Sequence, residues 1–335
     1  MVLISDYNYR QSGYFTNSRP KYVSDYNYKR YSLENGGKFM LNNIAISGFS
    51  DEISSDLDTQ LQKVSELGMR YISLRGIDDE NIGDYTVEKI KKNVIPKLKE
   101  WNISVSSIGS PIGKIYIQDE EAFEKQLEIL KNMCQIANVL SCKYIRIFSF
   151  YIPKEQNFDD YQHTVIKKLK AFAKIAEQYN VVLLHENEKD IFGDIARRCK
   201  FILDKVGSGH FKAIFDFANF VQCGEDTQAC YELLEPDIEY IHIKDAVYKD
   251  SINVVCGTGD GQIGSILKQA INSGYKGFLT LEPHLVVFDA IKDLEIEHST
   301  ETIQNTAAKD GAEGYQIQYE ALLEILKNIE NKENV

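Results

Sequence analysis

The chain has 335 residues, 43% of them hydrophobic, so it can bury the core of two small domains or of one α/β barrel of roughly 250 residues. It contains no apolar run of the roughly 18 to 20 residues that would span a membrane, which excludes a membrane protein with helical spans. A formal net charge of -12 argues against a nucleic-acid partner, because binding a phosphate backbone needs a basic face.

The first 39 residues differ in kind from the rest. They contain seven of the twenty tyrosines and a short imperfect repeat, SDYNYR and SDYNYKR, and they show neither helical nor strand periodicity. MVLI is too short an apolar stretch for a secretory signal. We therefore expect 1–39 to be a loosely ordered extension, with Met40 as an alternative start, and 40–335 to form the catalytic domain. The six cysteines form no Cys-x-x-Cys pair, which indicates reduced thiols and a cytoplasmic protein.

From residue 41 onward, short apolar runs alternate with longer amphipathic stretches, the pattern of repeated β-α units around a parallel sheet. The predicted strands are 44–50, 71–75, 103–108, 144–148, 181–185, 213–215, 240–243 and 278–281. The predicted helices are 57–67, 87–101, 121–139, 159–178, 191–205, 226–234, 263–272 and 315–329. Eight strands, each followed by a helix, predict an α/β fold of the (β/α)8 TIM-barrel type rather than an open doubly wound sheet.

Active sites of such barrels lie at the carboxyl ends of the strands, so the residues that end each strand are informative. The last four predicted strands end in acids or histidine: Glu186, Asp216, His242 and Glu282. The gaps between them are 30, 26 and 40 residues, about one β-α unit or slightly more, so each strand delivers one side chain to the barrel mouth. Three carboxylates and one imidazole suit one divalent ion, with Mn²⁺, Mg²⁺ or Co²⁺ favoured and Zn²⁺ acceptable.

This set of residues suits proton abstraction next to a carbonyl. A metal supplies charge for the enediolate that forms, and a glutamate beside it takes the proton. Returning the proton to the neighbouring carbon gives isomerisation, returning it to the opposite face gives epimerisation, and expelling a β-hydroxyl gives dehydration. Within VVLLHENE, strand alternation sends Glu186 into the barrel. It predicts a buried, hydrogen-bonded role for His185 and a supporting role for Glu188.

The chain from about residue 43 to residue 328 resembles the xylose isomerase-like TIM barrels, the sugar phosphate isomerase/epimerase group. The residues that carry the resemblance are LLHEN, IFDFANF, YIHIKDA, GTGDG and TLEPH. The resemblance implies that Glu186, Asp216, His242 and Glu282 bind one metal, and that Glu186 and Glu282 serve as acid and base. Members of this group are often dimers or tetramers, so the resemblance is compatible with a homo-oligomer. Asn219 departs from the pattern, because many members carry a second histidine three residues after the metal-binding aspartate.

Further polar residues near the strand ends are candidate substrate contacts, each with a structural alternative. Four of these residues closely follow the predicted ligands and could contact hydroxyls or a phosphate, or form salt bridges: Asn219, Lys244, Asp245 and His284. Lys114 could bind an anionic group, as could Arg75 and Arg146, for which salt bridges inside the barrel are the alternative. The GTGDG turn could hold a phosphate through its backbone N–H groups or be a flexible turn.

The sequence therefore predicts a metal-dependent isomerase or epimerase acting on a small sugar, a sugar phosphate or a related keto-polyol. A dehydratase or lyase acting on a cyclic polyol such as an inosose uses the same metal and base and is the nearest alternative. An abasic-site nuclease would need more histidines than the six present and a basic groove. Outside catalysis, a sugar-binding or regulatory barrel is the competing class.

Overall fold

The computed structural model describes residues 44–287, 302–303 and 308–333, all within one compact unit of the chain. The predicted extension, 1–39, and the first residues of the predicted catalytic domain lie outside the described residues.

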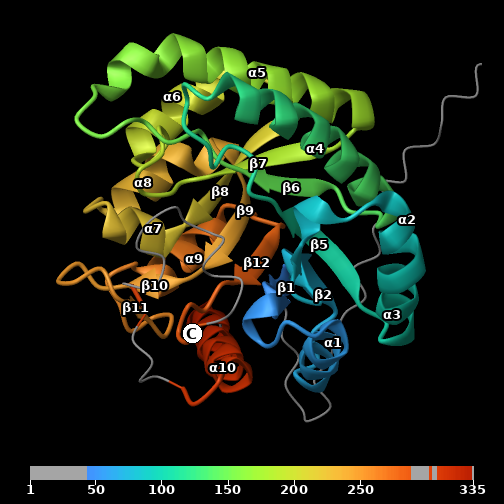
Figure 1. The fold of residues 1–335 in the computed structure, drawn as a ribbon. Coiled ribbons are helices and arrows are strands. Elements are labelled where there is room, and N and C mark those ends of the chain that lie inside the picture. Colours follow the sequence, from blue (N-terminus) through green and yellow to red (C-terminus); the bar gives the residue numbers. More distant parts are fainter. Residues whose placement is uncertain (1–43, 288–301, 304–307, 334–335) are drawn as a thin grey trace, which may run out of the picture. The chain divides into compact units, whose positions relative to one another are not determined.

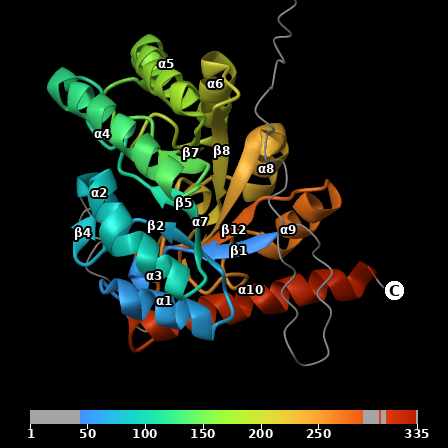
Figure 2. The ribbon, with the colours of Figure 1, turned by 90° about the vertical axis from the view of Figure 1, so that its right-hand side faces the viewer.

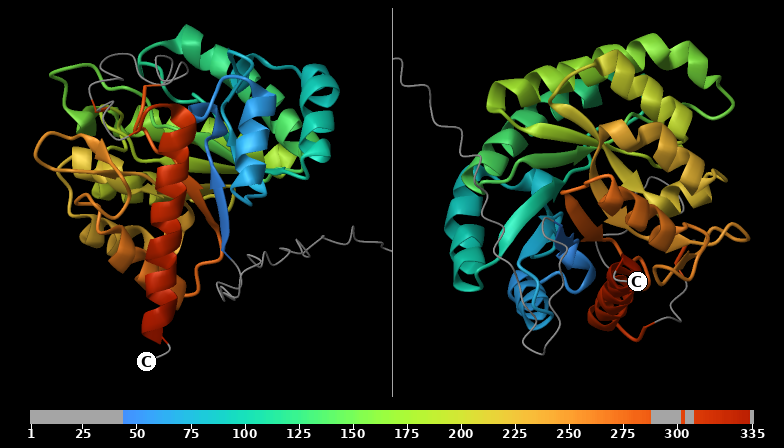
Figure 3. Two further views of the ribbon diagram at one scale, coloured as in Figure 1. Left: turned by 90° about the horizontal axis from the view of Figure 1, so that it is seen from below. Right: turned by 180° about the vertical axis from the view of Figure 1, so that it is seen from behind.

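In the described residues, eight parallel strands surround a common interior, as Figure 1 and the right-hand view of Figure 3 show. The sheet order is β1-β12-β9-β8-β7-β6-β5-β2, so neighbours in the sheet are neighbours in the β-α sequence. This confirms the predicted TIM barrel. The strands are β1 (Ala45–Gly48), β2 (Tyr71–Leu74), β5 (Ser104–Gly109), β6 (Tyr144–Ile147), β7 (Val182–Glu186), β8 (Phe211–Asp216), β9 (Ile238–Ile243) and β12 (Phe278–Leu281).

Helices cover the outside of this ring of strands, and Figure 2 shows α4, α5 and α6 side by side over one part of it. Each of these three helices buries an apolar stripe against the strands. In α4, this stripe contains Phe123, Leu130 and Met133. The helices are α1 (Leu57–Glu66), α2 (Val87–Lys89), α3 (Ile95–Glu100), α4 (Glu120–Val139), α5 (Gln162–Tyr179), α6 (Ala196–Val206), α7 (Phe217–Gln222), α8 (Thr227–Leu234), α9 (Ile263–Asn272) and α10 (Gly311–Glu333).

Four short strands pair in two antiparallel ribbons outside the barrel: β3 (Gly76–Ile77) with β4 (Glu80–Asn81), and β10 (Asp245–Ala246) with β11 (Asn253–Val254). Short 3-10 turns are Ser50–Glu52, Ile82–Asp84, Phe158–Tyr161 and Glu235–Asp237, and a π-helical turn, Ile90–Val94, joins α2 to α3. Among the helices that the structure describes, none is long and apolar enough to cross a membrane.

The predicted elements differ from the observed ones mainly at their ends. The predicted helix 191–205 begins only at Ala196, because Ile191 forms a bridge with Tyr151 and the Phe192 N–H donates to the Phe150 carbonyl. The predicted first strand, 44–50, ends at Gly48 and gives way to a 3-10 turn. The six-residue helix α7, directly after Asp216, was not predicted.

Alternate residues of each strand point into the barrel. The chemical character of these inward residues changes along the barrel axis. At the end where the strands begin, Val182, Leu184, Ile214, Tyr240 and Phe278 form an apolar cluster. Above it lies a layer of hydroxyl groups, in which the Tyr240 hydroxyl contacts those of Ser106, Ser107 and Thr280 at 2.9, 3.0 and 2.6 Å. The next inward positions of β9 and β12 hold His242 and Glu282, so the barrel carries its charges at the carboxyl ends of the strands.

The ring of strands closes differently between β1 and β2 than elsewhere. Among the described residues, a single parallel bridge, from Phe49 to Ser73, joins the two strands there. Asp51 and Glu52, in the 3-10 turn after β1, form ion pairs across the same gap with Arg75, which directly follows β2. Side-chain charges therefore supplement the backbone at this seam.

Candidate metal centre

Four residues at the ends of neighbouring strands meet inside the barrel mouth. Glu186 ends β7, Asp216 ends β8, His242 lies in β9, and Glu282 directly follows β12. One ligand atom from each lies within 4.8 Å of every other, and all four residues are buried. The fold therefore brings together the four predicted metal ligands.

The Nδ1 atom of His242 is the centre of this cluster. It lies 2.7 Å from Glu186 Oε1, 3.2 Å from Glu282 Oε2 and 3.8 Å from Asp216 Oδ2. The His242 ring is packed edge-on against Phe49 and Tyr240, with ring centroids 5.3 and 5.8 Å apart. These aromatic contacts fix the ring so that Nδ1 faces the three carboxylates.

Asn187 holds the ends of β7 and β8 in register. Its amide donates to the Asp216 carbonyl and accepts from the Asp216 N–H, both at 3.1 Å. Asp216 Oδ1 in turn caps α7 by accepting the Asn219 N–H at 2.9 Å. Asp216 is therefore oriented by a helix cap, and its second oxygen, Oδ2, is left facing the cluster.

Two cations contact the carboxylates from the sides. Lys244 Nζ lies 3.1 Å from Asp216 Oδ2 and 3.4 Å from Glu282 Oε2. Arg146 Nη1 lies 3.2 Å from Glu186 Oε2 and 3.6 Å from Glu282 Oε1. Both side chains are 4% exposed, so water screens these ion pairs little.

The electrostatics of the cluster favour positive charge at its centre. Burial lowers the pKa of His242, but the Glu186 and Glu282 carboxylates outweigh burial and raise it to about 9. Burial raises the pKa of Asp216 to about 7 against the opposing effect of Lys244. For Glu186, burial disfavours ionisation, yet His242 and Arg146 outweigh it and hold the pKa below its usual value. The pKa of Glu282 lies well below its usual value, because Lys244 and His242 outweigh burial in the same way.

The donor set fits one divalent cation. Glu186 Oε2 and Asp216 Oδ2 are buried and accept no hydrogen bond from the described residues, so each has lone pairs to offer. Three carboxylates with one imidazole are the ligands that Mn²⁺, Mg²⁺ and Co²⁺ favour, and Zn²⁺ accepts them. Because His242 must be neutral to bind a metal, loading the site would release its proton.

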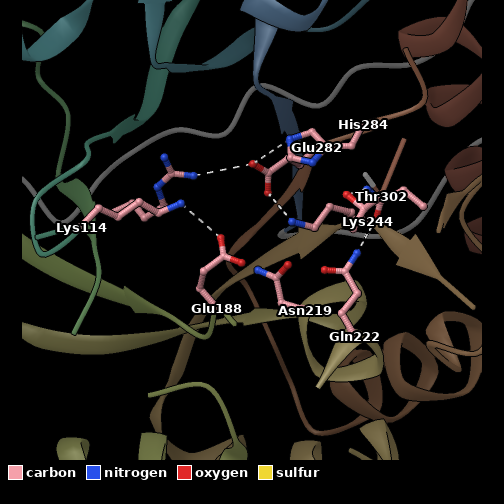
Figure 4. A pocket seen from close by; sticks show the side chains of 10 residues that line it. Lys114, Glu188, Asn219, Gln222, Lys244, Glu282, His284 and Thr302 are labelled. Atoms are coloured by element: carbon pink, nitrogen blue, oxygen red, sulfur yellow. Dashed lines mark hydrogen bonds and ion pairs between the residues drawn. The ribbon is translucent and has the colours of Figure 1, made fainter. Parts of the chain in front are cut away.

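A polar pocket lined by ten residues opens beside the cluster. Figure 4 shows Lys114 and Glu188 at one side of it, Gln222 and Thr302 at the other, and Glu282 with His284 and Lys244 between them. The remaining lining residues are Arg146, Asn219 and Asn253. Of the seven predicted substrate contacts, five line this pocket: Lys114, Arg146, Asn219, Lys244 and His284.

Arg75 is buried behind the cluster and does not line the pocket. Its guanidinium group contacts both oxygens of Asp51 at 2.7 and 3.0 Å, Glu52 at 3.3 Å and Glu282 at 3.1 Å. Burial raises the pKa of Glu52 to about 8, although Arg75 opposes this shift. These contacts favour the salt-bridge alternative for Arg75.

The second predicted contact outside the pocket lining is Asp245. Its carboxylate accepts the N–H groups of Gly257, Gly259 and Gly261 at 2.8, 3.0 and 3.0 Å. The glycines leave the room that this wrapping needs, since a Cβ at Gly259 or Gly261 would lie 2.5 or 2.6 Å from Asp245 Oδ1. The GTGDG turn therefore directs its N–H groups at a side chain of this chain, and the contacts favour a structural role for Asp245.

Replacing Asp245 with Ala is expected to lower the free energy of unfolding by about 1 to 3 kcal/mol, because one buried and two partly buried N–H donors of the glycine turn lose their acceptor. Urea unfolding measures the change. The matched control is Asp260→Ala in the same turn, since Asp260 is exposed and accepts a single N–H, from Tyr248. Equal losses in both variants, or a loss of activity at unchanged stability for Asp245→Ala, would contradict the structural role.

His185 and Glu188 flank the cluster. His185 is buried as predicted, but the predicted hydrogen bond is wrong, because neither ring nitrogen has a partner among the described residues. The ring stacks on Phe211, with ring centroids 6.2 Å apart, and burial lowers its pKa to about 4. Glu188 lies in the pocket wall and pairs with Lys114 at 3.3 Å.

The comparison with protein families agrees with this geometry. The model described as xylose isomerase-like TIM barrel matches residues 61–305, more than half of the chain. The chain belongs to the xylose isomerase-like TIM-barrel family. This confirms the resemblance that the sequence motifs carry.

Individual members of the xylose isomerase-like family are similar to this chain at low identity. A probable L-ribulose-5-phosphate 3-epimerase, UlaE, of Mycoplasma pneumoniae is 22% identical over 218 residues, which cover 65% of this chain and 68% of that protein. A solved L-ribulose 3-epimerase superposes with a TM-score of 0.66 at 18% identity, covering 87% of this chain and 97% of that one. The IOLI protein, solved with a zinc atom, superposes with a TM-score of 0.64 at 16% identity, covering 86% and 99%.

Sequence reasoning missed several residues around this xylose isomerase-like centre. Asp51 and Glu52 come directly after the predicted first strand, 44–50, so the rule that identified the ligands could have found them as well. Gln222 lies three residues after Asn219 on the unpredicted helix α7. Asn253 and Thr302 reach the pocket from distant loops, and no local sequence signal marks them.

Proposed function

We propose that this chain is a divalent-metal-dependent isomerase or epimerase acting on a small keto sugar, a sugar phosphate or a related keto-polyol, by proton transfer next to the carbonyl group. The observation that carries the proposal is the convergence of Glu186, Asp216, His242 and Glu282 beside a polar pocket. The similar proteins named as L-ribulose-5-phosphate 3-epimerase and L-ribulose 3-epimerase support this reaction class.

Glu186 and Glu282 are the proposed acid and base. The pKa of each lies below its usual value, since the neighbouring cations outweigh burial, so both are ionised near neutral pH and can accept a proton. One carboxylate removes the proton next to the carbonyl, and an enediolate forms. Return of this proton to the adjacent carbon gives isomerisation. Epimerisation requires the other glutamate to take up a proton from solvent and then to donate it to the opposite face of the carbon.

Glu186, Asp216, His242 and Glu282 would hold a divalent ion, which would supply Lewis acidity for the reaction. Around it, Lys244 and His284 are placed to orient the substrate from the pocket wall. Burial holds the pKa of His284 well below its usual value, so its ring is neutral. The pocket thus offers a neutral imidazole beside the ammonium group of Lys244.

The test is a screen of ketoses, aldoses, their phosphates and inososes in D2O, with protein loaded with Mn²⁺, Mg²⁺, Co²⁺ or Zn²⁺ in turn. Solvent deuterium appearing at a carbon next to the carbonyl, followed by NMR, is the expected result. Loss of water from the substrate would instead identify a dehydratase. A protein that binds a stoichiometric metal yet exchanges no proton of any substrate would contradict the proposal.

A further inference from the structure

The proposed function covers both free sugars and sugar phosphates, and the charges of the pocket distinguish the two. A site for a phosphate group presents cations or N–H donors that other acids do not already occupy.

Lys114 lines one side of the pocket, away from Lys244 in Figure 4. Its ammonium group lies 3.3 Å from Glu188 Oε2 and 4.4 Å from the centre of the Phe148 ring. The side chains of Lys114 and Glu188 are 8% and 11% exposed, so the pair is largely desolvated. A phosphate would have to displace the Glu188 carboxylate from this lysine.

Glu188 is held in place to keep that pairing. Its Oε1 accepts the N–H of Lys189 at 3.2 Å while Oε2 faces Lys114. The carboxylate is therefore bound at both oxygens, and Lys114 has its opposite charge built into the pocket wall.

The other cations lining the pocket are also paired with acids. Arg146 contacts Glu186 and Glu282, and Lys244 contacts Asp216 and Glu282. Each of the three cationic side chains that line the pocket is thus paired with a carboxylate. A phosphate ester, which carries about 1.5 to 2 negative charges, would therefore meet an acid beside each of them.

The amide side chains of the opposite wall have used their donors elsewhere. Gln222 Nε2 donates to the Ser251 carbonyl at 3.1 Å and to Asn253 Oδ1 at 3.0 Å. Asn219 Nδ2 donates to the Asn187 carbonyl at 2.8 Å. Their side-chain oxygens receive no hydrogen bond from the part of the chain that the structure describes. These oxygens can accept from sugar hydroxyls, whereas a phosphate dianion has no proton to donate to them.

We propose that the pocket takes an uncharged, polyhydroxylated keto sugar, and that Glu188 excludes the phosphorylated form by neutralising Lys114. The inference rests on the proposed function for its choice of a keto sugar. It assigns Glu188 a part in specificity that is separate from proton transfer.

Binding measured by calorimetry tests the inference. Metal-loaded full-length protein is titrated with two matched pairs, L-ribulose with L-ribulose 5-phosphate and D-fructose with D-fructose 6-phosphate, in phosphate-free buffer. The free sugar of at least one pair is expected to bind at least tenfold more tightly than its phosphate. In Glu188→Gln, which keeps the side-chain shape but leaves Lys114 without this acid, the ratio is expected to move at least tenfold toward the phosphate.

The matched control is Glu121→Gln, which removes one acid from an exposed pair with Lys125 on α4 and should leave the ratio unchanged. Tighter binding of the phosphate by the unmodified protein, an unmoved ratio in folded Glu188→Gln, or no binding of any of the four compounds would overturn the inference. If Glu188→Gln does not fold, the ratio of the unmodified protein decides alone. Deuterium exchange is measured in parallel, so a preference for the free sugar without exchange would sink the proposed function and leave this inference standing.

Discussion

Replacing Glu186 with Gln is expected to lower the rate of substrate proton exchange by roughly 100- to 10,000-fold, the usual effect of losing a general base. The same change removes a carboxylate that lies 2.7 Å from His242 Nδ1, so metal affinity should fall as well. Elemental analysis of the purified variant and exchange measured at saturating metal separate the two effects. Because Gln keeps the size of the side chain, the barrel should still fold.

The matched control for this variant is Glu239→Gln. Glu239 lies near the start of β9, at the other end of the barrel, and pairs with Lys143 and Tyr144. It should retain metal and full exchange. If Glu186→Gln binds metal and exchanges protons like the unmodified protein, Glu186 is neither ligand nor base.

Replacing Arg75 with Met is expected to lower the free energy of unfolding by about 3 to 5 kcal/mol, the cost of removing one partner from a buried ion pair. Arg75 is 1% exposed and contacts Asp51, Glu52 and Glu282, which would all lose their shared cation. Urea unfolding of both proteins at the same saturating metal concentration measures the difference, since bound metal itself adds stability.

Lys97→Met is the matched control, because Lys97 pairs with Asp58 at 2.9 Å on the surface, where the two side chains are 30% and 57% exposed. An exposed pair of this kind contributes about 1 kcal/mol or less. A loss for Arg75→Met no larger than that of this control would show that the three carboxylates do not depend on Arg75.

The fold was predictable because each barrel strand is a short apolar run between amphipathic helices. All eight predicted strands coincide with barrel strands, and differences are confined to their ends. The helix predicted to begin at residue 191 begins at Ala196 in the structure, for a physical reason. The prediction counted the apolar residues Ile191 and Phe192 as the start of the helix, but they bury their side chains in a loop that contacts Phe150 and Tyr151.

The proposed metal ligands were predictable because a single rule covers them: the carboxyl ends of parallel strands meet at one edge. The same rule reaches Asp51, the residue after the predicted first strand, and its neighbour Glu52, but it was applied only to the last four strands. Pairings such as that of Lys114 with Glu188 join loops 74 residues apart. No local pattern encodes such a contact. The sequence therefore suggested Lys114 as an anion site, whereas in the fold Lys114 forms an ion pair with Glu188.

The seam between β1 and β2 has a dynamic consequence. Elsewhere, opening the ring of described strands breaks a ladder of backbone hydrogen bonds, whereas here the ends of the two strands are held by one bridge and by ion pairs of Arg75. Local opening therefore costs least at this joint. Arg75 also contacts Glu282, a residue of the candidate metal centre. Any separation of β1 and β2 therefore moves a positive charge away from Glu282, so opening of the barrel at this joint changes the electrostatics of the site.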